Sequence, residues 1–273
     1  MNLPYPQTRK DRWSDLVRGA AMAAFIVIPP ALTTPIARDA TLATAMRDGD
    51  AAFRVFDNET ARLCYERAFA IDSTRCDVLW KLARSNIDCG MVAPRDDRPR
   101  WFASSERLTR RCVSLYPDSS EAHFFLAVAI GQMTKVVGNK RRIELSREVK
   151  GEAETTLLID PAHAGAMHIL GRWNYEVAGL GWFSKMAAKI VYGGVPPGAS
   201  YQQAKEWFEN AIAERPDMPL NHLWLGETLI KLDDYAGARQ ALQVCLDLDD
   251  VLWDDSHTKA QARKKLHDIQ GRK

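Results

Sequence analysis

The sequence is poor in cysteine, in long apolar runs and in excess charge of either sign. Five cysteines among 273 residues are too few and too scattered for a small disulfide-stapled fold. The apolar run at residues 19–28 is far shorter than the roughly 20 residues that a membrane-spanning helix needs. With 37 basic and 35 acidic side chains, the net charge of +2 gives no general attraction to nucleic acid. Because 46% of the residues are hydrophobic, the chain still has ample material for a folded core.

Sequence signatures of catalysis and of metal or cofactor binding are also missing. The six histidines form no His-Glu-x-x-His run, and no Cys-x-x-Cys pair offers a zinc half-site. Gly179 and Gly181 lack the third glycine of a dinucleotide fingerprint, and neither a phosphate loop nor a Gly-x-Ser-x-Gly elbow occurs. We therefore predict a protein that is not an enzyme, with no catalytic residue, metal or cofactor. An active site assembled across the fold is the remaining alternative.

Residues 1–40 are predicted to be a signal peptide or an N-terminal hydrophobic anchor. Four basic residues precede the apolar run, Pro29 and Pro30 end it, and small residues follow up to Ala37. Cleavage after Ala37 would give an exported protein, periplasmic or membrane-associated; an uncleaved anchor and an organelle presequence are the alternatives. Residues 1–37 carry four basic and two acidic side chains, which accounts for the whole excess of positive charge. The remaining chain is formally neutral.

The cysteines are predicted to form no required disulfide. Five is an odd number, so at least one thiol would stay unpaired even in an oxidising compartment. Cys112 and Cys245 also occupy positions where a helix needs small apolar side chains, which favours plain packing.

A period near 34 residues organises the chain after Thr41 and indicates a helical repeat. The clearest unit covers residues 219–250 and predicts two helices. Gly226 and Ala238 are the small residues at which these helices cross, whereas Leu242 and Cys245 bury the second helix. Asp233 and Asp234 supply the turn and the N-cap between the helices.

Four further units fit the same period, ending near Asp72, Pro117, Pro161 and Pro216. The last of these fits only if residues 177–199 are an insertion between its helices. Residues 90–99 are predicted to be a loop, and residues 135–142 a basic turn before a helix at 144–159. Residues 254–269 predict a polar capping helix. The predicted fold is all-α: a tetratricopeptide-like solenoid over residues 41–273, with about five helix pairs and a C-terminal capping helix.

Some runs are more specific than the repeat: Leu-Gly-Arg-Trp at 170–173, Gly-Gly-Val-Pro-Pro at 193–197, and the stretches 121–123, 131–132, 140–143 and 159–161. With these motifs, residues 60–250 resemble the regulator of microtubule dynamics family, in a bacterial-type form. The resemblance implies a tetratricopeptide-like domain without enzymatic activity, associated with microtubules or mitochondria. One branch of the family tethers endoplasmic reticulum to mitochondria and handles phospholipid. The resemblance therefore adds a cytoplasmic or mitochondrion-associated location as an alternative to export.

First-helix positions of the repeats are expected on the concave face, where solenoids bind partners. Many of them are apolar or aromatic, which suits an extended peptide or an acyl chain. The candidate binding residues are Trp80, Arg84, Phe124, Val128, His168, Arg172, Tyr175, Leu223 and Glu227. The alternative is that the insertion or the terminal helix fills this face, which would make them ordinary core residues.

A second set of candidates would contact lipid or a membrane surface. In the insertion, Lys185 and Lys189 would meet phosphate headgroups while Trp182 and Phe183 meet acyl chains. Structural packing of this segment, with snorkelling lysines, is the alternative. Arg141 and Arg142, like Arg172, would bind phosphate through forked contacts or else form structural salt bridges.

The sequence thus favours a non-catalytic scaffold that binds a protein or peptide through its concave face. A phospholipid-binding or lipid-transfer module, using an apolar groove and the 177–199 insertion, is the alternative. Nucleic acid is not an expected partner.

Overall fold

The computed structural model describes residues 35–180 and 199–272 of the chain. The chain divides into two compact units, residues 1–40 and residues 41–273. Of the first unit only residues 35–40 are described, and they are helical. The predicted signal peptide therefore lies almost wholly outside the described residues, as does most of the predicted insertion.

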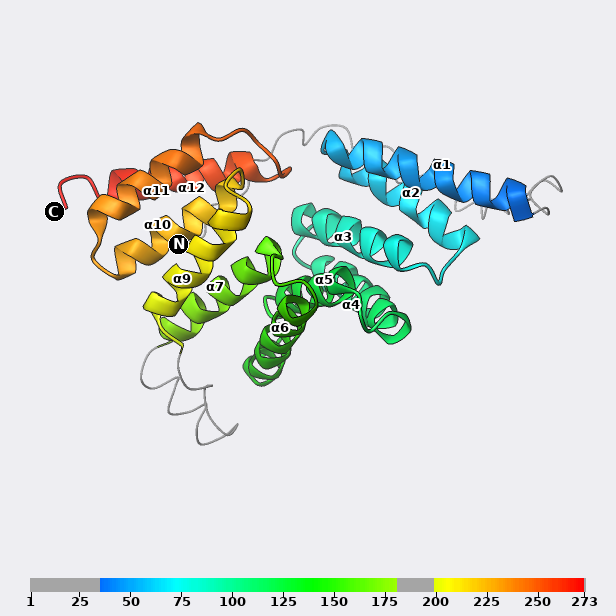
Figure 1. Cartoon of the computed structure of the whole chain (residues 1–273), viewed down its shortest axis with the longest axis horizontal. Helices are drawn as coiled ribbons and strands as arrows, with labels where there is room; N and C mark the ends of the chain where they lie inside the picture. The colour runs from blue at the N-terminus through cyan, green and yellow to red at the C-terminus, as the bar shows by residue number, and fades with distance from the viewer. Residues whose placement is uncertain (1–34, 181–198, 273) are drawn as a thin grey trace. The chain divides into compact units, whose positions relative to one another are not determined.

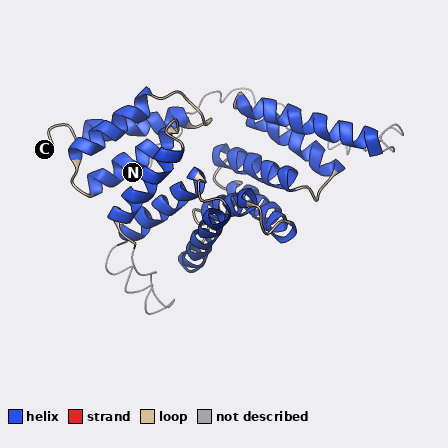
Figure 2. Ribbon diagram, viewed as in Figure 1, coloured by secondary structure: helices blue, strands red, loops and turns tan. Residues whose placement is uncertain are grey.

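The described residues are helical throughout, apart from turns and loops, and contain no strand (Figure 2). Figure 1 labels the helices in chain order. Their bounds are α1 (Pro35–Arg54), α2 (Asn58–Ile71), α3 (Cys76–Val92), α4 (Arg98–Leu115), α5 (Ser120–Met133), α6 (Asn139–Ile159), α7 (Ala164–Ala178), α9 (Tyr201–Glu214), α10 (Pro219–Lys231), α11 (Tyr235–Asp247) and α12 (Asp255–Asp268).

The helices of residues 41–273 pack as sequential pairs, as the repeat period predicts. The buried side chains of α1 and α2 share one core cluster. Extensive contacts then join α3 with α4, α5 with α6, α7 with α9, and α10 with α11. The last described helix, α12, packs on both α10 and α11. The predictions of an all-α fold, of five helix pairs and of a C-terminal capping helix are confirmed.

Small residues allow the two helices of a pair to approach closely. A Cβ added at Gly226 of α10 would lie 2.6 Å from Leu242 Cγ of α11, and one added at Gly171 of α7 would lie 2.7 Å from the ring of Phe208. Ala238, opposite Gly226, is fully buried. The crossing predicted at Gly226 and Ala238 is therefore present, because only a residue without a side chain fits there.

Polar side chains fix the ends of the helices. Asp234 caps α11 by accepting from the backbone N–H of Gly237 at 2.8 Å, and Asp233 takes the left-handed conformation of the preceding turn, with φ of 59°. Two histidines bind back to the proline carbonyl six residues earlier: His123 Nε2 lies 2.9 Å from the oxygen of Pro117, and His222 Nε2 lies 2.9 Å from that of Pro216. Each of these two histidines connects the loop after one helix pair to the first helix of the next pair.

Two predicted loops turn out to be partly helical. Helix α3 continues to Val92 and α4 begins at Arg98, so the loop predicted at residues 90–99 is reduced to residues 93–97. Helix α6 begins at Asn139 rather than near Glu144. Arg142, in its first turn, donates to the carbonyl oxygen of Thr134 in the preceding turn at 3.0 Å.

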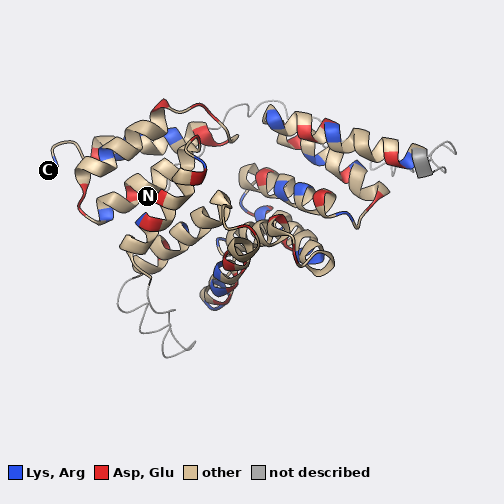
Figure 3. Cartoon of the chain, in the orientation of Figure 1, with Lys and Arg blue, Asp and Glu red and all other residues tan. Residues whose placement is uncertain are grey.

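Charges of both signs are distributed along the helices (Figure 3), in keeping with a body that is formally neutral after residue 37. Among the described residues, no helix combines the length and the apolar character that crossing a bilayer requires.

Candidate functional site

The first helices of neighbouring pairs contact one another: α3 contacts α5, α5 contacts α7, and α7 contacts α10. Most residues predicted for the binding face lie half-buried on these helices, namely Trp80, Arg84, Phe124, Val128, His168, Arg172 and Tyr175. Together with Trp224 of α10, all of these except His168 form what we call the first-helix surface. The structure thus brings onto one set of contacting helices the residues that the repeat register selected.

The other two predicted residues lie deeper. Leu223 is only 1% exposed and belongs to the core between α10, α11 and α12. Its neighbour Trp224 takes the half-buried position instead. Glu227 is 9% exposed and accepts from Lys265 Nζ of α12 at 2.8 Å. Leu223 and Glu227 therefore fasten the capping helix rather than line a surface.

Arg84 lies in a half-buried polar and aromatic cluster. Its guanidinium carbon stands 3.3 Å from the ring centroid of Phe53 and 5.3 Å from that of Trp80. One guanidinium nitrogen donates to the hydroxyl of Tyr65 at 3.3 Å, and that hydroxyl donates to Asp50 at 2.7 Å. The Nε atom of Arg84 is shielded from water and has no hydrogen-bond partner among the described residues.

Arg172 repeats this arrangement on α7. Its guanidinium carbon stands 3.5 Å from the ring centroid of Trp224, and one nitrogen lies 3.2 Å from the exposed carboxylate of Glu176. Tyr175 packs edge-on against Trp224, with ring centroids 5.3 Å apart, and also against Tyr201 of α9. Within the described part of the chain, Arg172 Nε is likewise shielded and without a hydrogen-bond partner.

The two arginines occupy the same place in the repeat, directly after Leu82-Ala83 and after Leu170-Gly171. Partial removal from water lowers the pKa of both guanidiniums. An arginine stacked on an aromatic face keeps the edge of its fork available for a carboxylate or phosphate. Each arrangement therefore holds an oriented cation over an aromatic ring.

The loop between α11 and α12 also reaches a first helix. Trp253 Nε1 donates to Asp88 Oδ1 of α3 at 3.1 Å. Burial raises the pKa of Asp88 to about 6, although Trp253 and the charge of Arg84 act in the opposite direction. At the end of α5, desolvation and the positive charge of Arg172 lower the pKa of Lys135 to about 8.

Sequence reasoning missed Asp88, Lys135, Trp224 and Trp253. Asp88 and Trp224 lie on predicted first helices, and a search one turn beyond each candidate would have found Asp88. Lys135 and Trp253 lie outside the repeat helices. The repeat period predicts which side of a helix a residue is on, but it makes no prediction for residues between helices. A tryptophan in the acidic linker after the last pair was the one available signal.

His168 is held inside the helix array rather than presented to a ligand. Its Nδ1 donates to Asn221 Oδ1 of α10 at 2.7 Å, and its ring packs against Phe208 at 5.6 Å between centroids. Desolvation, assisted by the charge of Arg172, lowers the pKa of His168 to about 3. The ring is therefore neutral at physiological pH and joins α7 to α10.

The predicted lipid contacts are described only in part. Trp182, Phe183, Lys185 and Lys189 lie outside the described residues.

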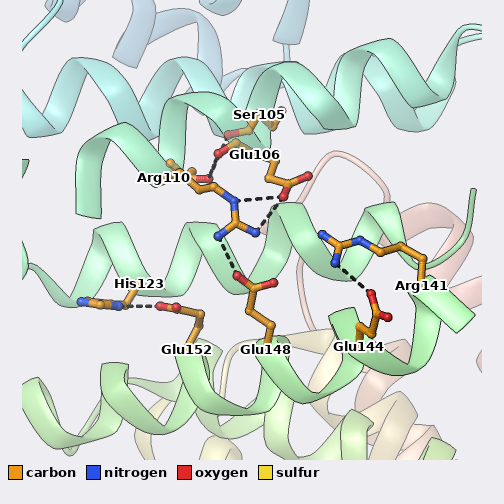
Figure 4. A network of polar contacts seen from close by, with 9 residues as sticks. Ser105, Glu106, Arg110, His123, Arg141, Glu144, Glu148 and Glu152 are labelled. Atoms are coloured by element: carbon orange, nitrogen blue, oxygen red, sulfur yellow. Dashed lines mark hydrogen bonds and ion pairs between the residues drawn. The ribbon is translucent and has the colours of Figure 1, made fainter. Parts of the chain in front are cut away.

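Arg141 is exposed and forms a 3.1 Å ion pair with Glu144, one turn further along α6. In Figure 4 this pair lies beside a network in which Arg110 of α4 bridges Glu106 and Glu148. The described contacts of Arg141 and Arg142 are thus local to α6 and to the turn before it.

Comparison with known proteins identifies the family. The family described as "Regulator of microtubule dynamics protein 1-3" matches residues 46–270. The chain belongs to this family. Family members and proteins of this fold are generally non-catalytic, and no group of three or more His, Cys, Asp or Glu side chains within the described ranges is arranged to hold a metal ion.

Curated family members match over part of their length. Regulator of microtubule dynamics protein 1 of Bos taurus is 29% identical over 164 residues, which are 59% of this chain and 51% of that protein. Regulator of microtubule dynamics protein 3 of Xenopus laevis is 27% identical over 70% of this chain and 41% of that protein. The chain spans about half the length, or less, of these relatives.

Solved structures confirm the tetratricopeptide fold. A thermophilic TPR protein of Thermus thermophilus superposes with a TM-score of 0.61, covering 83% of this chain and 99% of that chain at 14% identity. PilF of Pseudomonas aeruginosa superposes with a TM-score of 0.53, covering 86% of this chain and 99% of that chain at 14% identity. At these identities the likeness concerns the fold alone.

Proposed function

We propose that this protein is a non-catalytic scaffold that binds another protein through the first-helix surface. The observation that carries the proposal is the pair of half-buried arginines, Arg84 and Arg172, each stacked on an aromatic ring with its Nε lacking a partner among the described residues. The Nε atoms themselves are shielded, so a partner carboxylate would bind the terminal nitrogens of the two guanidiniums, where a charge-assisted hydrogen bond forms. Two oriented cations on one set of contacting helices are therefore the argument for binding.

The chemistry of this surface selects a partner segment with two properties. Trp80, Phe124, Tyr175 and Trp224 are half-buried aromatic side chains, and their exposed parts would contact apolar side chains of a partner. The guanidinium of Arg172 requires a carboxylate that competes successfully with Glu176, whose side chain is 63% exposed. The fitting partner is an extended segment in which an acidic side chain stands near apolar ones.

Site-specific photo-crosslinking tests this face. A photo-crosslinking amino acid at Val128, which is half-buried on α5, would lie within the proposed interface. The matched control carries the same amino acid at Leu158, which is 84% exposed on the second helix α6. We expect one protein partner to be crosslinked from position 128 and not from position 158. Equal capture from both positions would rule out the first-helix surface as the interface.

A phospholipid is the second candidate ligand, favoured by the cations Lys135 and Arg172. The charge of Arg172 is one cause of the lowered pKa of Lys135, so the two cations lie within electrostatic reach of each other. Two such cations suit a phosphate headgroup. Native mass spectrometry of the protein purified from its own membranes separates the two candidate ligands. A lipid that co-purifies with the wild type and is lost in Arg172→Gln supports the phospholipid. If no lipid co-purifies, the protein partner remains.

A further inference from the structure

Two cysteines from the paired helices α3 and α4 lie with their sulfur atoms in contact. Cys76 Sγ and Cys112 Sγ are 2.9 Å apart, although 36 residues separate them in the sequence. A disulfide bond is about 2.05 Å long, so bond formation requires the two sulfur atoms to approach by only ~0.9 Å. Both thiols are free in this structure.

The two thiols have different surroundings. Cys112 is fully buried and packs with Leu79 and Ala122. Cys76, the first residue of α3, is half-buried, and its thiol also lies 3.4 Å from the Ser119 hydroxyl. Cys76 is therefore the thiol that a small molecule in solution reaches first. Burial and the neighbouring sulfur raise the pKa of Cys112.

We propose that Cys76 and Cys112 form a dithiol–disulfide couple, in which Cys76 reacts first with a small-molecule disulfide and Cys112 completes the bond. The Cys76 thiolate attacks one sulfur of oxidised glutathione, forms a mixed disulfide and releases the first glutathione thiol. The Cys112 thiol then loses its proton, attacks the Cys76 sulfur and releases the second glutathione. Two protein thiols are oxidised, and one glutathione disulfide is reduced to two thiols.

The resulting bond would staple the first and second helices of one repeat. It joins the start of α3 to the last turn of α4, beside Ser119, whose hydroxyl accepts from the backbone N–H of Ala122 and caps α5. A crosslink across 36 residues restricts the unfolded chain, so the oxidised protein should melt at a higher temperature than the reduced one. The fold forms without the bond, since Cys112 already fills its core position as a thiol.

Mass spectrometry of the full chain tests the couple. The folded protein is incubated with oxidised glutathione, denatured, alkylated and digested with trypsin. We expect the number of alkylated thiols to fall from five to three, with peptide 76–81 linked to peptide 112–135. Cys64, Cys89 and Cys245 should remain alkylated. Five alkylated thiols, or linkage to any other cysteine, would overturn the proposal.

Two variants complete the test. Cys76→Ala keeps every fully buried side chain of this cluster and should abolish both the linked peptides and the rise in melting temperature. Cys89→Ala alters another half-buried cysteine of α3 and should retain both. If Cys76→Ala still melted at a higher temperature after oxidation, the staple would not be the cause of the stabilisation, and the proposed couple would fail.

Discussion

Gly226 is a residue of close approach between α10 and α11, and a single added methyl group tests this approach. In Gly226→Ala the new Cβ would lie 2.6 Å from Leu242 Cγ, in a cluster where Leu242 is fully buried. We expect a loss of about 1–3 kcal/mol in the free energy of unfolding, because the branched side chain has no space to move into. Urea denaturation measures this loss.

The matched control is Gly151→Ala, in the middle of α6. A Cβ added there meets nothing within 4 Å in the described structure. Alanine restricts the unfolded chain and favours a helix, so this variant should gain about 0.5–1 kcal/mol. Opposite signs for the two variants confirm the close approach. Similar values would show that α10 and α11 do not cross at Gly226.

Asp88 is expected to make the free energy of unfolding depend on pH, and the direction of this dependence follows from its raised pKa. Burial raises its pKa from 3.8 to about 6, so between these values the folded protein binds more protons at Asp88 than the unfolded chain does. The contribution of Asp88 to the free energy of unfolding therefore falls as pH rises from about 4 to 6. Asp88→Asn still accepts from Trp253 but cannot ionise, so it should lose this component.

The measurement is the stability of Asp88→Asn minus that of the wild type, across pH 4–7. Other titrating groups contribute to both proteins and cancel in the difference. We expect the difference to increase with pH and to level off above about pH 6. Parallel profiles would mean that Asp88 is not held away from water by the α11–α12 loop.

Single residues also show where sequence reasoning stops. The crossing residues Gly226 and Ala238 were predictable, because a repeat period fixes which positions must be small. The period did not show which of Leu223 and Trp224 is the half-buried residue. The two are adjacent apolar residues on the same helix, and the repeat does not fix the rotation of that helix closely enough to separate them. Trp253 was out of reach for another reason: its partner, Asp88, is 165 residues away.

At the scale of helices, the errors in the predicted boundaries have a common cause. Pro99 indicated a loop, yet it stands in the first turn of α4, where a missing N–H does no harm. The basic run at residues 140–142 indicated a turn, yet arginine and lysine are good helix formers and here belong to α6. The local composition correctly identified both segments as polar. A polar segment can be either a loop or the first turn of a helix, so composition alone did not locate the helix start.

The capping helix α12 can be tested by one substitution at two positions. Ala262 is fully buried in the cluster with α10 and α11, whereas Ala260 is exposed on the same helix. Ala262→Glu places a carboxylate in that core and should destabilise the protein by about 3 kcal/mol or more. Ala260→Glu should stay within about 0.5 kcal/mol of the wild type.

Urea denaturation of the two variants measures the contribution of the cap. A large loss in Ala262→Glu alone shows that α12 seals the end of the repeat array. If both variants were as stable as the wild type, the packing of α12 on α10 and α11 would not contribute to the fold.

For the whole protein, the fold was predictable because the repeat period recurs five times and each unit needs its neighbour to bury its apolar side. The surface was less predictable. The register selected Arg84 and Arg172, but their stacking on Phe53 and Trp224 joins residues from neighbouring pairs. A binding surface made of such contacts emerges only when the helices are placed in space.

The central claim, that the first-helix surface binds a protein partner, is tested most directly by the dissociation constant of the crosslinked partner. Arg172→Gln removes the guanidinium that stacks on Trp224, whereas Arg107→Gln removes an exposed arginine from the second helix α4. We predict that Arg172→Gln weakens binding about tenfold or more, the loss of one hydrogen bond to a charged group, while Arg107→Gln stays within about twofold. Equal affinities for Arg172→Gln, Arg107→Gln and the wild type would contradict the account.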